Sequence, residues 1–253
     1  MKEGQRLWTR EELILAINLY CKIPFGKIHA RNPKLIAFAQ LIDRKPGAIS
    51  FKLGNFASLD PSLKQKGVDH TSKLDKEIWN EFFRDREEIL FEGENLKAKK
   101  LNISLEELYK LDEAELPTEG IERDRMVKTR VNQNLFRSGV LSGFNFKCCI
   151  TGIDRAEFLV AGHIRPWSLD KENRMNFSNG LCLNALHDKA FETGLLTITP
   201  DYKIKVSSEL LKSKDPATDQ YFAKYDGKEI ILPSRFLPDP EFLVYHNNER
   251  FKP

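Results

Sequence analysis

Residues 157–191 read EFLVAGHIRPWSLDKENRMNFSNGLCLNALHDKAF, and their pattern changes three times. An apolar run, Glu157–Ile164, predicts a strand, which ends before Pro166 because proline cannot continue a ladder. After a polar loop, Ser178-Asn179-Gly180 predicts a turn into the short apolar strand Leu181–Leu183. Asn184 can then cap a helix that runs to Phe191. The order strand, loop, strand, helix is therefore expected, with His163 ending the first strand, Asn179 before the second, and His187 on the helix.

Several separated blocks of this region resemble the HNH nucleases, the family with the ββα-metal or His-Me finger fold. The similarity is to restriction-type HNH domains of bacterial defence systems, and it covers residues 121–207. Five positions before these blocks resemble the helix that leads into such domains. The blocks are Cys149-Ile150-Thr151-Gly152, Gly162 to Ser168, Ser178-Asn179-Gly180-Leu181 and Leu186 to Phe191, and the helix positions are Arg130, Gln133, Phe136, Arg137 and Val140.

The resemblance implies an endonuclease, a phosphodiester hydrolase whose roles fall on particular residues. His163 corresponds to the general base, since a neutral imidazole can take a proton from water near pH 7. Asn179 corresponds to the residue that holds the loop and orients this base, and His187 to an imidazole ligand of a divalent metal. Arg165 and Lys189 flank the site and could grip phosphates of DNA. The expected metal is Mg²⁺, with Mn²⁺, Ni²⁺ and Zn²⁺ as alternatives.

One position departs from the family pattern. Many HNH enzymes carry an Asp or His immediately before the base, where it binds the metal, but this chain has Gly162 there. Two replacements are open: Asp188 supplies the missing ligand, or waters and substrate phosphates fill the coordination sphere, as Mg²⁺ readily allows.

The N-terminal 60 residues predict three short helices. Thr9 and Glu12 fit a capping box before the first, and Pro33 and Pro46 stand where the second and third would begin. Two helices joined by the short polar turn 43–45 resemble a helix-turn-helix unit. The alternatives are a DNA reader and a plain three-helix bundle. A reader would use the cluster Arg44, Lys45, Ser50 and Lys52.

The remaining segments complete an α+β organisation. We divide the chain into a helical DNA-binding domain over 1–60, a charged helical connector over 61–120 and an HNH nuclease domain over 121–253, with its core motif at 148–207. Expected elements are helices over 74–90 and 121–142, a strand over 144–151 and a hairpin over 195–206. The tail, 208–253, is expected to dock as extended chain.

Composition places the chain among globular proteins. Its 253 residues carry a formal net charge of +3, and no run approaches the apolar length of a membrane span. Residues 1–60 hold ten Lys or Arg against five Asp or Glu, which favours contact of this region with a polyanion. The polar N-terminus lacks a signal-peptide pattern, so a cytoplasmic location is expected. The four cysteines lack paired metal-site spacing and are expected to be buried thiols.

Three functions are compatible with these patterns. The first is a metal-dependent DNA endonuclease of the restriction or defence type. The second is a regulator that binds DNA without cutting it, and the third is a nuclease effector controlled by a partner. Cutting both strands with one site per chain would favour a homodimer.

Overall fold

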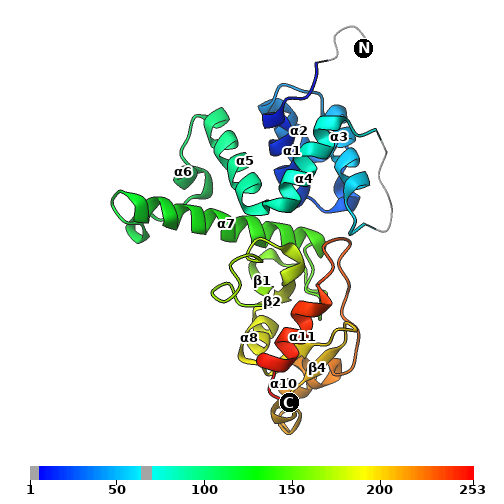
Figure 1. Cartoon of the computed structure of the whole chain (residues 1–253). Helices are drawn as coiled ribbons and strands as arrows, with labels where there is room; N and C mark the ends of the chain where they lie inside the picture. Colours follow the sequence, from blue (N-terminus) through cyan, green and yellow to red (C-terminus); the bar gives the residue numbers. More distant parts are fainter. Residues whose placement is uncertain (1–5, 64–69) are drawn as a thin grey trace. The chain divides into compact units, whose positions relative to one another are not determined.

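The computed structural model describes residues 6–63 and 70–253. Residues 1–5, for which the sequence predicts no signal peptide, lie outside the described residues. The chain divides into two compact units, Met1–Leu135 and Phe136–Pro253 (Figure 1). The sequence-based division at residues 60 and 120 stays a prediction.

The first three helices of the first unit begin at the predicted residues. α1 spans Arg10–Lys22 behind a complete capping box of Thr9 and Glu12. α2 (Pro33–Leu41) and α3 (Pro46–Leu59) both start with proline, whose fixed φ suits the first helical turn.

The charged helix expected over 74–90 is two helices. α4 covers Lys73–Arg84 and α5 covers Arg86–Leu101, and the chain breaks at Asp85. Asp85 leaves the helical conformation, with ψ at 81°, and its side chain caps α5 by accepting from the Glu88 amide. α5 packs on α1, and α6 (Leu105–Tyr109) follows it, so residues beyond 60 share a core with the first three helices.

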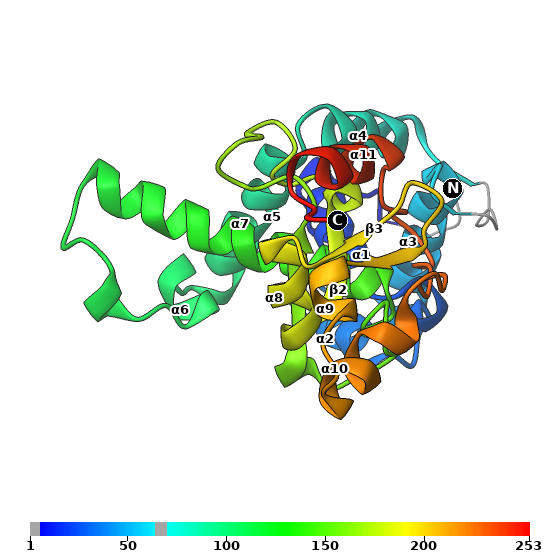
Figure 2. The ribbon, with the colours of Figure 1, turned by 90° about the horizontal axis from the view of Figure 1, so that it is seen from below.

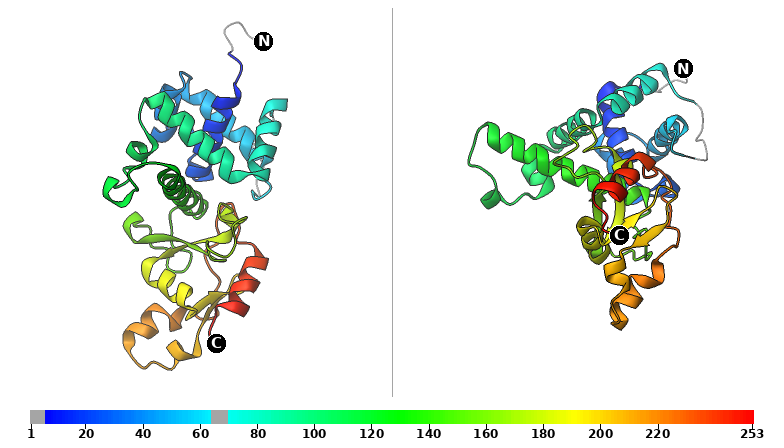
Figure 3. Two further views of the ribbon diagram at one scale, coloured as in Figure 1. Left: turned by 60° about the vertical axis from the view of Figure 1, so that its left-hand side comes forward. Right: turned by 60° about the horizontal axis from the view of Figure 1, so that its bottom comes forward.

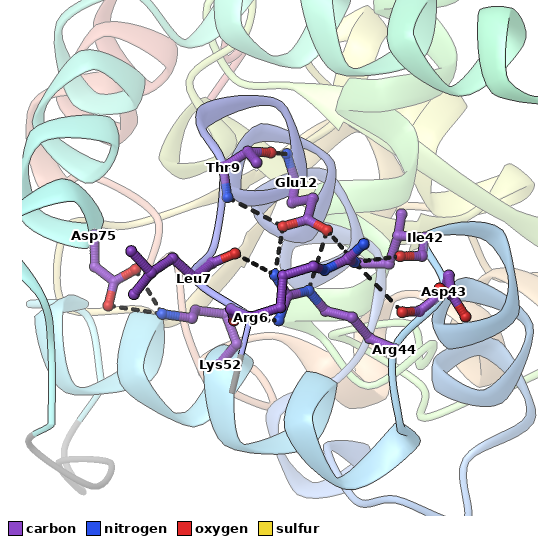
Figure 4. A network of polar contacts seen from close by, with 9 residues as sticks. All are labelled: Arg6, Leu7, Thr9, Glu12, Ile42, Asp43, Arg44, Lys52 and Asp75. Atoms are coloured by element: carbon purple, nitrogen blue, oxygen red, sulfur yellow. Dashed lines mark hydrogen bonds and ion pairs between the residues drawn. The ribbon is translucent and has the colours of Figure 1, made fainter. Parts of the chain in front are cut away.

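Arg44 and Lys52 lie within a polar network rather than on an open surface (Figure 4). The Arg44 guanidinium donates to both carboxylate oxygens of Glu12, at 3.1 and 2.6 Å, and to the Leu7 carbonyl at 2.7 Å. Lys52 Nζ lies 2.7 and 2.9 Å from the two oxygens of Asp75, with side-chain exposures of 7% and 0%. Both cations therefore neutralise buried carboxylates: Arg44 ties α1 to the turn before α3, and Lys52 ties α3 to α4.

Lys52→Ala is expected to lower the free energy of unfolding by about 3–5 kcal/mol, because it leaves the Asp75 carboxylate buried without its partner. Urea unfolding monitored by circular dichroism measures the change. The control is Lys73→Ala. This lysine lies on α4, like Asp75, but its side chain is 93% exposed, so the free energy of unfolding should change by less than about 0.5 kcal/mol. Equal, small effects of both substitutions would contradict a structural role for Lys52.

The second unit contains the expected strand–loop–strand–helix arrangement. β1 (Leu159–His163) pairs antiparallel with β2 (Gly180–Asn184), and α8 (Ala185–Thr193) packs on both strands (Figure 3). Asn184 caps α8 as predicted, accepting from the His187 amide at 3.0 Å. The last part of α7 (Ile121–Gly143), from Phe136 onward, also belongs to this unit. Together these elements confirm the α+β class.

Two sequence expectations in this unit are wrong. Residues 144–151 form turns, because Asn145 and Phe146 have φ values of 54° and 56°, which a strand cannot contain. The tail contains three helices where extended chain was expected, α9 (Ser208–Leu211), α10 (Pro216–Tyr221) and α11 (Pro240–Glu249), and residues 226–239, before the last of them, run without helix. The predicted hairpin is present as β3 (Leu196–Ile198) and β4 (Ile204–Val206), and α11 lies beside β3 (Figure 2).

The cysteines follow the prediction, since all four are buried free thiols. Within the described part of the chain, no helix combines the length and apolar character needed to cross a bilayer.

Candidate active site

His163 ends β1 with its imidazole held on several sides. Its Nε2 lies 3.0 Å from the Arg174 carbonyl oxygen, which can only accept, so Nε2 carries the proton. In residues 6–63 and 70–253, no hydrogen bond reaches Nδ1. The lone pair on Nδ1 is therefore free, and Nδ1 is the basic nitrogen of the ring. Burial lowers the pKa of His163 below its usual range, so the ring is neutral near pH 7.

Asn179 holds the loop between the strands. Its side chain is fully buried and accepts from the Arg165 amide at 2.8 Å. Its amide group donates to the carbonyls of Arg165 and Asn173, at 3.2 and 3.3 Å. Asn179 thereby holds Arg165 and Asn173 in the loop whose Arg174 carbonyl is the hydrogen-bond partner of His163.

Asp188 occupies the space next to the base that Gly162 leaves open. A Cβ at Gly162 would lie 2.6 Å from Asp188 Oδ1, so any side chain there would displace the carboxylate. Burial, reinforced by the charge of Glu192, raises the pKa of Asp188 above its usual range. Nothing in the described residues forms a hydrogen bond or ion pair with this carboxylate, and a cation beside it would favour its charged form.

A cavity of about 310 Å³ lies beside His163 and Asp188. Gly162, His163, Asp188 and Glu192 all line it. Asp188 and Glu192 stand four residues apart on α8, a spacing that places both on one helix face. Two carboxylates and a neutral imidazole at one cavity form an arrangement that can hold a hard divalent cation and take a proton from water.

Comparison with known families identifies this region. Residues 148–199 match the family model of the HNH endonucleases. This segment is an HNH domain. The matched segment lies within the second unit, and the match confirms the resemblance to the HNH family drawn from the separated sequence blocks. No curated protein matches the chain.

His187, predicted as a metal ligand, is buried and hydrogen-bonded at both ring nitrogens. The ring is 1% exposed, and its Nε2 lies 2.7 Å from the Tyr221 carbonyl oxygen, to which it donates. Its Nδ1 accepts from the Asn184 side-chain amide at 2.8 Å. One ring nitrogen is therefore protonated and the lone pair of the other is engaged, so His187 would have to give up one of these hydrogen bonds to bind a cation, and its role as a ligand stays a prediction.

The other predicted residues are differently placed. Arg165 is half-buried and pairs with Asp170 at 3.2 Å, while Lys189 is exposed and pairs with Glu192 at 2.9 Å. In the first unit Lys45 is exposed and Ser50 half-buried, whereas Arg44 and Lys52 are engaged in the internal network.

Sequence reasoning missed Glu192 and His246. The spacing of Asp188 and Glu192 on the predicted helix was a usable signal for the first. His246 is 2% exposed, with its ring stacked on Phe191. Burial lowers the pKa of His246 to about 4, so it stays neutral. Its position on α11 carried no sequence signal.

Proposed function

We propose that the HNH domain is a divalent-metal-dependent DNA endonuclease in which His163 activates the attacking water and Asp188 with Glu192 holds the metal. The observation that carries this proposal is the Asp188 carboxylate beside Gly162, at the cavity that His163 lines. Hydrolysis of a phosphodiester needs a base for water and stabilisation of charge on the phosphate and the leaving oxygen. The residues around this cavity meet the first need directly.

The donor set favours a hard cation. Carboxylate oxygens and water suit Mg²⁺ or Mn²⁺, and Mg²⁺ retains several waters when only one or two carboxylates bind it. In the described ranges no three His, Cys, Asp or Glu side chains converge as a complete set, so two carboxylates with water and a DNA phosphate are the fitting shell. When bound, such an ion would stabilise negative charge on the phosphate and on the departing 3′ oxygen.

The chain's own side chains supply the base and the phosphate contacts. Nδ1 of His163 accepts the proton of the attacking water, while the Arg174 carbonyl keeps the other ring nitrogen protonated. Arg165 and Lys189, near the two ends of the site, would contact flanking phosphates. The test is cleavage of plasmid DNA with Mg²⁺ or Mn²⁺, compared with a metal-free reaction containing a chelator, which should leave the plasmid intact.

The pH dependence of cleavage should reflect the buried base. Because the pKa of His163 is lowered, the ring remains neutral at a lower pH than an exposed histidine. Activity should therefore be retained as the pH falls through about 6.5 and be lost only below it. Single-turnover rates across pH at saturating metal measure the midpoint. A midpoint above the ordinary histidine value would contradict the assignment of this buried ring as the base.

For the first unit we propose DNA binding through exposed cations such as Lys45. Arg44 and Lys52 are left out because they neutralise buried carboxylates. Lys45→Ala should weaken duplex binding and reduce the slope of log affinity against log salt by about 1, as expected for one lost phosphate contact. Fluorescence anisotropy over a salt series measures it. An unchanged slope, as expected for the exposed control Lys73→Ala, would remove Lys45 from the interface.

A role in restriction or another defence system, in the cytoplasm, extends this proposal and is supported by the sequence resemblance. The restriction role predicts sequence- or modification-dependent cutting, which end-sequencing of products from modified and unmodified DNA would reveal. Metal-dependent cutting by the chain alone would argue against both a DNA-binding regulator without nuclease activity and an effector that needs a partner. Sedimentation of the chain on DNA would show whether a homodimer forms for double-strand cutting.

A further inference from the structure

Phe136, on α7, lies face to face with the imidazole of His163. The ring centroids are 3.6 Å apart and the planes are inclined by 10°. Phe136 is 2% exposed, so the contact is part of the packed interior of the second unit. It precedes the matched segment 148–199, so the aromatic wall against the base is contributed from outside that segment.

Gly180 makes this close approach sterically feasible. It is the register partner of His163 across the β1–β2 pair. A Cβ at Gly180 would lie 2.4 Å from Val140 Cγ2 and 2.9 Å from Phe136 Cζ, far inside normal contact. The absence of a side chain opposite His163 therefore leaves room for α7 to bring the Phe136 ring over the imidazole.

Arg137 fastens the same turn of α7 to the start of β1. Its guanidinium donates to the Leu159 carbonyl at 2.6 Å and to the Ala156 carbonyl at 3.1 Å. The helix is thus tied to the strand by hydrogen bonds at one end and by the ring contact at His163. Displacement of Phe136 alone would remove the second of these attachments.

We propose that Phe136 is a positioning residue for the general base: its ring blocks one face of the His163 imidazole and fixes the direction of Nδ1. Trp167 meets the same imidazole edge-on, with centroids 5.4 Å apart and planes at 83°, and the Arg174 carbonyl holds Nε2. Without the face contact the ring can tilt about its remaining hydrogen bond. Catalysis by a base depends steeply on its geometry, and a misplacement of about 1 Å costs about 100-fold.

This inference rests on the proposed function, with His163 as base, and two substitutions test it. Phe136→Met keeps a flexible apolar side chain in the core but removes the aromatic plane. Gly180→Ala keeps both rings and adds a Cβ that the Val140 and Phe136 side chains must move to admit. Both should lower kcat by about 10- to 100-fold with KM changed by less than about threefold, since the DNA contacts are intact. Phe144→Met, at a buried residue just past the end of α7, is the packing control and should retain kcat.

A spectroscopic readout does not depend on activity. The ring protons of His163 lie over the Phe136 face, where the ring current shifts their resonances upfield. In ¹H–¹³C spectra of the full chain, the His163 signals, identified by their loss in His163→Gln, should move downfield in Phe136→Met and stay unchanged in Phe144→Met. The dispersion of all signals in the same spectra also reports whether each variant is folded.

The two variants should share one mechanism. In the double variant Phe136→Met/Gly180→Ala, the loss in kcat should be smaller than the product of the single losses, because both act through the same ring. A downfield shift together with the kcat loss supports positioning. A kcat equal to wild type in Phe136→Met, or an unshifted His163 signal, overturns it. If wild type itself does not cut DNA, the proposed function fails first, and the role of Phe136 toward a base fails with it.

Discussion

Asp188→Asn should abolish metal-dependent cleavage, with a rate loss of about 100-fold or more, and should weaken Mn²⁺ binding. The substitution preserves size but removes the charge that lies against Gly162, where a Cβ would be 2.6 Å from Asp188 Oδ1. Loss of even an outer-shell partner costs metal sites about 10- to 100-fold in affinity, and a direct ligand should cost at least as much. Titration calorimetry with Mn²⁺ measures affinity independently of cleavage.

Asp201→Asn is the matched control for this prediction. It removes the same charge from an exposed side chain in the same unit, on the turn between β3 and β4, and should leave Mn²⁺ affinity within about twofold. Full Mn²⁺ affinity in Asp188→Asn, together with its loss in a folded His187→Gln variant, would reverse the assignment and restore His187 as the ligand.

The HNH core could be predicted because its signals are local. The apolar run before His163, the Asn179 turn and the Asn184 cap each depend on a few neighbouring residues, and all three features appear in the structure. The helix starts at Pro33 and Pro46 were recoverable for the same reason, since proline fixes the first helical turn through its own backbone geometry.

The roles of particular side chains were less accessible because they depend on contacts far along the chain. His187 appeared to be a ligand from its position in the motif, but the Tyr221 carbonyl that engages it lies on α10, which the sequence did not reveal. Arg44 and Lys52 were two of the four residues expected to contact DNA, and only their partners Glu12 and Asp75 show that they are internal. In each case hydrogen bonding and burial, rather than residue type, decide what the side chain can bind.

The proposed metal-binding residues could be predicted from the sequence only in part. Gly162 signalled that a ligand was missing, and Asp188 was one of the two replacements considered. Its partner Glu192 could have been found from the four-residue spacing on the predicted helix, which places both carboxylates on one face. The stacking of Phe136 on His163 could not, because it requires the packing of α7 against the β1–β2 pair.

His163→Gln is expected to have the largest effect on the chemical step. Glutamine keeps a polar side chain that can still donate to the Arg174 carbonyl, but it has no group that takes a proton from water near pH 7. General-base catalysis contributes about 10²- to 10⁴-fold, so the rate should fall by that factor. Metal affinity should be unchanged, since the proposed ligands are Asp188 and Glu192, and DNA binding should stay within about twofold of wild type.

The most direct measurement is therefore single-turnover cleavage of plasmid DNA by wild type and His163→Gln at saturating Mg²⁺, with Mn²⁺ binding titrated on the same preparations. The account predicts a loss in rate of about 10²- to 10⁴-fold with Mn²⁺ affinity retained. Equal cleavage rates for the two proteins would contradict it.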